Sequence, residues 1–188
     1  METRRMKKPK KNYINNADFF AAIVDYQQKR KKAEEEGNEI PKMPNYLGEC
    51  FMKLARGIMS RPNFASYPYR EEMILDSTER CIRYIMTFKP EKTDRAFSFF
   101  SRVIWNAAIN RISYERKIQY ERSKMMLDQS HSAMVYEEQF LGGSQTPKHL
   151  EHLEEFIETY EALEKIRIAK AKERKLERES LSETPSSS

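Results

Sequence analysis

Hydrophobic residues recur every three or four positions along most of this chain, which is the spacing of one face of an α-helix. The first such segment starts after Asn15 or Asn16, either of which can cap a helix by accepting its first amide protons. It reaches Gly37, a residue type that commonly ends helices. The pattern predicts a second helix over about 46–60 and then a loop over 61–69, which contains two prolines.

Three more helices are predicted in the rest of the chain. Pro68 suits the first turn of the third helix, which ends before Pro90. The fourth begins near Arg95 and continues beyond Lys124, and the last covers about 148–179 with a narrow apolar stripe between charged residues. The apolar positions expected to face inward on the third helix are Met73, Ile74, Ile82, Ile85 and Met86.

Breaks in this pattern define the expected domains. Residues 1–12 are basic and contain a proline, so we expect a flexible arm. Residues 13–127 form the expected compact helical domain, and 128–147 lose periodicity and include two glycines, which indicates a linker. The charged helix 148–179 forms a C-terminal extension, and the serine-rich residues 180–188 are expected to be disordered.

Composition favours an all-α protein. The chain has 188 residues, of which 39% are hydrophobic and 34% charged, and only 5 glycines, fewer than the turns of a β-rich fold require. Aromatic residues make up 11%, which is too many for a disordered chain. No apolar run approaches the roughly 18 residues of a membrane span, so no membrane partner is expected.

The net charge of +5 is unevenly distributed. Residues 1–128 carry 26 Lys or Arg against 17 Asp or Glu, whereas residues 129–188 carry 8 against 12. A basic body with an acidic tail is typical of proteins that bind a polyanion, although a solvated surface gives the same pattern.

Groups that perform catalysis are scarce. The sequence contains no Gly-rich phosphate loop, no HExxH and no CxxC. His149 and His152 lie one helical turn apart without an evident third metal ligand, and Cys50 and Cys81 fit small core residues in a reducing cytoplasm. We expect no enzymatic activity, no metal and no cofactor.

The third predicted helix carries an acidic stripe. Glu72, Asp76 and Glu79 follow helical spacing on the side away from the core. Such a stripe is also typical of a plain solvated face.

The fourth predicted helix is basic and aromatic. Seven Lys or Arg oppose two Glu over residues 95–124, which favours contact with phosphates. Phe97, Phe99, Phe100 and Trp105 add flat rings on which an unpaired base can stack. The same rings also suit a helical core, so both interpretations stay open. The core stripe by spacing is Trp105, Ala108, Ile109 and Ile112, and the neighbouring stripe, either core or stacking platform, is Phe97, Phe100 and Ile104.

Three short motifs follow one another over residues 72–111. An acidic helix ends in Phe88-Lys89-Pro90, a new helix starts with Phe97-Ser98-Phe99-Phe100, and Ala108-Ile109-Asn110-Arg111 comes next. Their order and spacing resemble the second conserved region of bacterial RNA polymerase sigma factors. The Trp pair usual in primary sigma factors aligns with Val103 and Ile104, one position before the only Trp of this chain.

Further motifs are similar to the late-transcription sigma factors of T-even-type phages. They are Asn12-Tyr13-Ile14-Asn15-Asn16, Asn63-Phe64 before Tyr67, Glu72-Met73-Ile74, and Arg111-Ile112-Ser113-Tyr114-Glu115-Arg116-Lys117. The resemblance covers about residues 12–122.

This resemblance implies a promoter-specificity subunit that acts in the cytoplasm of an infected bacterial cell. It would bind the host core RNA polymerase, and recognise and melt AT-rich −10-like late promoters. The acidic helix would dock on the clamp helices of the largest polymerase subunit through Glu72, Leu75, Asp76, Thr78, Glu79 and Ile82. The next helix would bind promoter DNA, especially the non-template strand, through Phe97, Phe99, Phe100, Arg102, Val103, Asn106, Asn110, Arg111, Arg116 and Lys117.

Family members also couple to a phage sliding clamp, with a co-activator, through an acidic and hydrophobic C-terminal tail. The present chain ends in KLERESLSETPSSS, which has no aromatic cluster. Two alternatives need no polymerase: a stand-alone helical DNA-binding or architectural protein, and a helical adaptor that uses residues 148–179.

Overall fold

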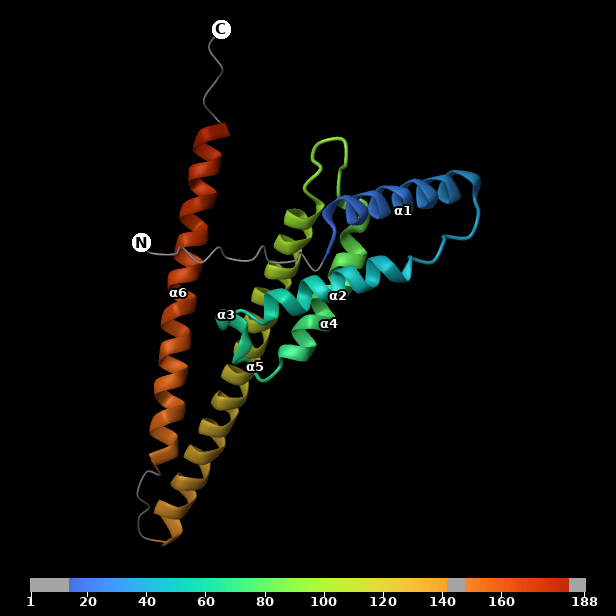
Figure 1. Ribbon diagram of the computed structural model, residues 1–188. Coiled ribbons are helices and arrows are strands. Elements are labelled where there is room, and N and C mark those ends of the chain that lie inside the picture. Colours follow the sequence, from blue (N-terminus) through green and yellow to red (C-terminus); the bar gives the residue numbers. More distant parts are fainter. Residues whose placement is uncertain (1–13, 142–147, 183–188) are drawn as a thin grey trace, which may run out of the picture. The chain divides into compact units, whose positions relative to one another are not determined.

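The computed structural model describes residues 14–141 and 148–182 and confirms the all-α class (Figure 1). No β-strand occurs in these two ranges. The elements are α1 (Asn16–Glu36), α2 (Asn45–Met59), α3 (Pro62–Ala65), α4 (Arg70–Tyr84), the 3₁₀ turn η1 (Ile85–Thr87), α5 (Ala96–Leu141) and α6 (Lys148–Ser182). The expected basic arm, 1–12, lies outside the described residues.

The chain divides into two compact units, one up to Ile112 and the other from Ser113 on. We refer to them as unit 1 and unit 2. Helix α5 contributes to both units, because its first part belongs to unit 1 and the rest to unit 2.

Both ends of α1 agree with the sequence. The Oδ1 of Asn15 accepts a hydrogen bond from the amide of Ala17 at 3.1 Å, which satisfies one of the free donors of the first turn. Gly37 ends the helix with a φ of 69°, and its amide donates to the carbonyl of Ala33. Only glycine adopts this left-handed conformation without steric cost.

The core of unit 1 is an aromatic cluster around Phe100. The Phe100 ring lies 4.8 Å from that of Phe51 on α2, 5.9 Å from that of Phe19 on α1 and 6.0 Å from that of Phe88, measured between centroids. All four side chains are fully or almost fully buried. Burial of each ring stabilises the fold by about 1.5–3 kcal/mol, and together the rings join three helices and the segment after η1.

A buried amide connects α1 to the end of α4. The Nε2 of Gln27 donates to the carbonyls of Ile85 and Phe88 at 2.5 and 2.8 Å, and only 5% of Gln27 is exposed. Ile85 begins η1 and Phe88 follows it, so this buried amide holds both ends of the turn and fixes the chain that carries Phe88.

Three expectations about local structure are wrong. The expected linker begins too early: residues 128–141 are helical and continue α5, because no glycine or proline interrupts them before Gly142. The rest of that segment, 142–147, lies outside the described residues. The expected loop contains the short helix α3, which starts at Pro62 and buries Phe64 against Trp105, 4.7 Å away between ring centroids. Residues 180–182 of the expected disordered tail belong to α6.

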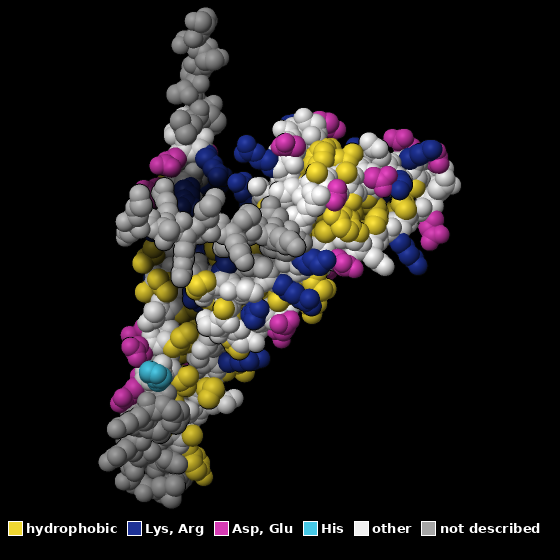
Figure 2. Space-filling view, viewed as in Figure 1, with side chains coloured by type: hydrophobic (Ala, Val, Ile, Leu, Met, Phe, Trp, Pro, Cys, Tyr) yellow, Lys and Arg dark blue, Asp and Glu magenta, His cyan; other side chains and the backbone are white. Residues whose placement is uncertain are grey.

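Unit 2 is a pair of helices that run antiparallel. The rings of Tyr120 on α5 and Tyr160 on α6 are stacked, with centroids 4.5 Å apart, and the Tyr120 hydroxyl donates to Glu161 at 2.7 Å. Further along α5, His131 lies 3.6 Å from Glu154 on α6. Later residues of α5 thus meet earlier residues of α6, and hydrophobic side chains remain visible at the surface along both helices (Figure 2).

We predict that Gln27→Ala lowers the free energy of unfolding by about 1–3 kcal/mol, because it removes the donor that two buried carbonyls share. Urea denaturation followed by circular dichroism measures the change. The matched control is Gln28→Ala, whose side chain is exposed on the same helix and whose loss changes stability by no more than about 0.5 kcal/mol. Equal midpoints for the two variants would contradict the role given to Gln27.

Candidate functional site

Helix α4 presents an acidic and apolar surface to solvent. Leu75 and Ile82 lie two turns apart and are 60% and 39% exposed. Glu72 and Glu79 are also exposed and also lie two turns apart. These four residues, all predicted to bind a partner, share one face of α4, which we call the α4 face.

The expectation that Ile82 faces inward is wrong. The buried side of α4 consists of Met73, Ile74, Ser77, Thr78 and Cys81. Small side chains at 77, 78 and 81 let α4 lie close to α2, and the stripe that they form leaves Ile82 on the other side.

Thr78 does not belong to the α4 face, which corrects its assignment as a partner-binding residue. Its side chain is only 8% exposed, and its hydroxyl donates to the carbonyl of Ile74 at 2.8 Å. The buried hydroxyl is therefore satisfied within α4.

Asp76 and Arg111 were expected to contact different partners, but they pair with each other. The Nη1 of Arg111 on α5 donates to Oδ2 of Asp76 on α4 at 2.9 Å, with the two side chains 26% and 43% exposed. The ion pair fixes the register between the helix that carries the α4 face and the helix that follows it in unit 1.

The part of α5 that belongs to unit 1 carries a polar stripe without a single acidic residue. No Asp or Glu occurs between Arg95 and Tyr114. The exposed side chains along it are Arg95, Ser98, Arg102, Asn106, Ile109 and Asn110, which recur at helical spacing and which we call the α5 stripe. Sequence reasoning selected Arg102, Asn106 and Asn110 but missed Ser98, and it wrongly placed Ile109, 43% exposed, in the core.

The aromatic side chains of α5 differ in exposure. Phe100 is fully buried, so its ring cannot stack on a base in this structure, and its predicted role changes to support of the core. Phe97, Phe99 and Val103 are partly buried and pack against that core. The Phe99 ring lies 5.1 Å from Phe100 and is thereby held at the edge of the unit.

Arg116 and Lys117 belong to unit 2, apart from the other predicted DNA-binding residues. Both are exposed. Lys117 lies 3.7 Å from Glu121 on the same helix, whereas Arg116 lines a groove of unit 2 together with Phe156 and Tyr160.

The two cysteines of unit 1 are buried on α2 and α4. Burial raises the pKa of the Cys81 thiol to about 12 and also raises the pKa of Cys50, so both stay protonated near neutral pH and are poor nucleophiles. Within residues 14–141 and 148–182, no three His, Cys, Asp or Glu side chains gather as a metal site requires. None of the helices in the described part of the chain combines the length and apolar character of a membrane span.

Comparison of the sequence with known protein families and with curated proteins finds no match.

We predict a coupling free energy of about 0.5–1 kcal/mol between Asp76 and Arg111, because the pair is partly shielded from solvent. A double-mutant cycle with Asp76→Ala and Arg111→Ala, measured by urea denaturation, gives this value. Glu72→Ala is the control, since Glu72 lies on the exposed side of α4 and its effect should add to that of Arg111→Ala. Additive effects of Asp76→Ala and Arg111→Ala would mean that the ion pair does not join the helices.

Proposed function

We propose that this protein is a sigma-type promoter-specificity subunit of a host bacterial RNA polymerase, active late in phage infection in the cytoplasm of the infected cell. It would recognise and open AT-rich −10-like promoters. One observation carries the proposal: a single compact unit exposes an acidic and apolar face on α4 and a polar stripe without acidic residues on α5. The order of sequence motifs that resembles sigma factors runs through these same two helices.

The α4 face has the properties of a surface that binds a helical partner. Leu75 and Ile82 supply apolar area at a spacing of two turns, which suits the side chains of a coiled coil such as the polymerase clamp helices. Glu72 and Glu79 flank them and favour a basic partner. In such an interface the apolar contacts provide most of the affinity, while the charges guide association and register.

The α5 stripe has the properties of a surface that binds a separated DNA strand. Arg102 suits a phosphate, and the amides of Asn106 and Asn110 can donate and accept hydrogen bonds at base edges. Phe97 and Phe99 keep part of their rings accessible, and stacking of one unpaired base on such a ring contributes about 1–3 kcal/mol toward strand opening.

The order of events follows from the chemistry of these surfaces. Bases reach the rings of α5 only when they are unstacked, and the unit 1 part of α5 has few basic residues for tight binding to intact duplex. Binding to polymerase through α4 would therefore come first, and capture of the non-template strand would follow during melting.

We predict that Leu75→Arg weakens binding to core RNA polymerase at least about tenfold, because it places a charge in the centre of the apolar contact. A pull-down with core polymerase, followed by titration, measures the effect. Leu176→Arg is the matched control, since Leu176 is 65% exposed but lies on α6. Failure of the wild-type protein to bind polymerase would contradict the proposal.

The companion variant Arg102→Ala/Asn106→Ala tests the DNA side. It should keep wild-type affinity for polymerase and lose transcription from an AT-rich −10-like promoter. Binding of the polymerase complex to this promoter should depend less on salt concentration, because one phosphate contact is gone. Equal binding of wild-type protein to duplex DNA with and without polymerase would instead identify a stand-alone DNA-binding protein.

A further inference from the structure

The charge of α6 changes sign at one point. From Glu151 to Glu164 the helix carries six Glu and no Lys or Arg, and from Lys165 to Arg178 it carries seven Lys or Arg against two Glu. The helix dipole favours acidic residues near the start of a helix and basic residues near its end, but its effect is confined to the first and last turns. Some of the acidic side chains contact α5, where Tyr120 donates to Glu161 and His131 lies 3.6 Å from Glu154, whereas the side chains of the basic half are exposed.

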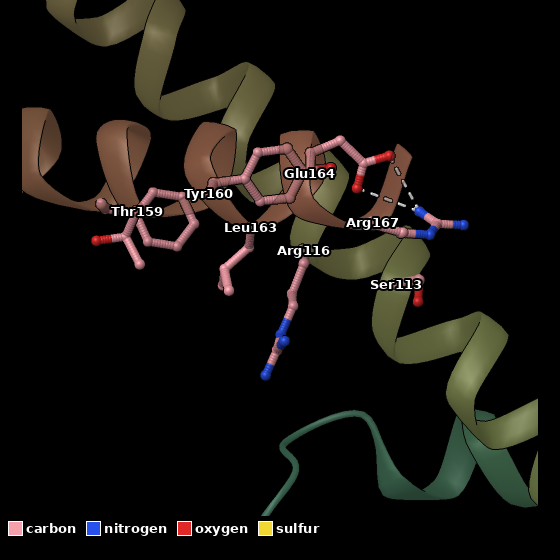
Figure 3. A pocket seen from close by; sticks show the side chains of 8 residues that line it. Ser113, Arg116, Thr159, Tyr160, Leu163, Glu164 and Arg167 are labelled. Carbon is pink, nitrogen blue, oxygen red and sulfur yellow. Dashed lines mark hydrogen bonds and ion pairs between the residues drawn. The ribbon is translucent and has the colours of Figure 1, made fainter. Parts of the chain in front are cut away.

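Exposed apolar side chains flank the point at which the charge changes. Leu163 and Ile166 are 56% and 52% exposed, one on either side of the step from Glu164 to Lys165. Leu163 lines a groove of about 480 Å³ between α6 and the unit 2 part of α5, with Tyr160 beside it and Arg116 extending from α5 (Figure 3). Ile166, Lys170 and Arg174 continue this surface along α6.

In the described part of the chain, the second half of α6 is exposed to solvent. Every side chain from Lys165 to Ser180 is exposed, including Ile168 at 57% and Leu176 at 65%. Helices in proteins derive most of their stability from packing of an apolar face, and an isolated helical segment of this length is marginal in water. A partner that packs along α6 would supply the missing contact.

We propose that α6 pairs with α6 of a second copy of this chain in an antiparallel arrangement. A two-fold axis near Leu163 and Ile166 brings these apolar residues of both copies together. It also places the acidic half of each helix along the basic half of the other. A parallel pair would instead put like charges side by side. Because α5 packs on α6 within each copy, the product is a four-helix assembly. This inference does not depend on the proposed function.

Sedimentation velocity of the full chain tests the proposal. We expect a species of twice the 22.4 kDa chain mass at low salt and at protein concentrations up to about 0.1 mM. The dimer should dissociate as salt rises toward about 1 M, where the Debye length falls to about 3 Å and the complementary charges are screened. A monomer under all these conditions would overturn the proposal and leave α6 to a different partner.

Charge-reversed variants test the antiparallel arrangement itself. Lys170→Glu/Arg174→Glu lowers the net charge of the basic half of α6 from +5 to +1, and Glu151→Lys/Glu155→Lys changes that of the acidic half from −6 to −2. Each variant alone should lose at least about a hundredfold in dimer affinity, because most of the charge complementarity is lost and the substituted residues face side chains of like charge. Mixing the two variants should restore a heterodimer, since the introduced Glu residues of one copy then face the introduced Lys residues of the other.

The matched control is Lys172→Glu/Lys175→Glu, which makes the same change in net charge on another side of α6 and should keep the dimer. Circular dichroism verifies that each variant is as helical as the wild-type protein. Failure of the mixed variants to associate, with helicity intact, would rule out antiparallel pairing.

Discussion

The packing of Phe100 is the interaction on which the rest of unit 1 depends. Its ring meets side chains from α1, α2 and the segment after η1, and it lies on α5 between residues that face outward. The core therefore fixes the rotation of α5 about its own axis. Because successive positions on a helix point about 100° apart, burial of Phe100 decides which neighbouring side chains reach solvent. The α5 stripe is a direct consequence.

The same constraint governs α4. Gln27 donates to the carbonyls of Ile85 and Phe88 on either side of η1, which positions Phe88 in the aromatic cluster, and Asp76 contacts Arg111 on α5. Helix α4 is thus tied at its end to α1 and along its length to α5. The α4 face and the α5 stripe belong to one packed unit, so that a partner bound to the first would present the second in a defined orientation.

Local features of the fold could be predicted from the sequence, while the choice between adjacent helix faces could not. Asn15 and Gly37 cap α1 through hydrogen bonds within a single turn, so their roles can be predicted from the local sequence. For Phe100 and Ile82, helical periodicity allowed the side chain to face either the core or solvent. Which of the two occurs depends on where the neighbouring helices pack, and Phe100 is buried while Ile82 is exposed. The continuation of α5 to Leu141 was missed because residues 128–141 lack apolar periodicity although no residue among them breaks a helix. For the candidate site, helical spacing placed Glu72 and Glu79 on the side of α4 that is exposed, whereas the Asp76–Arg111 pair has no signature in the sequence.

The central claim is that the two surfaces of unit 1 contact different partners in a fixed order. Oxidation of side chains by hydroxyl radicals, read by mass spectrometry, tests it most directly, because Leu75 and Ile82 on α4 and Ile109 on α5 are all exposed in the free protein. The account predicts that core polymerase alone protects Leu75 and Ile82, and that Ile109 becomes protected only when promoter DNA is added. Unchanged oxidation of Leu75 and Ile82 in the polymerase-bound protein would contradict it.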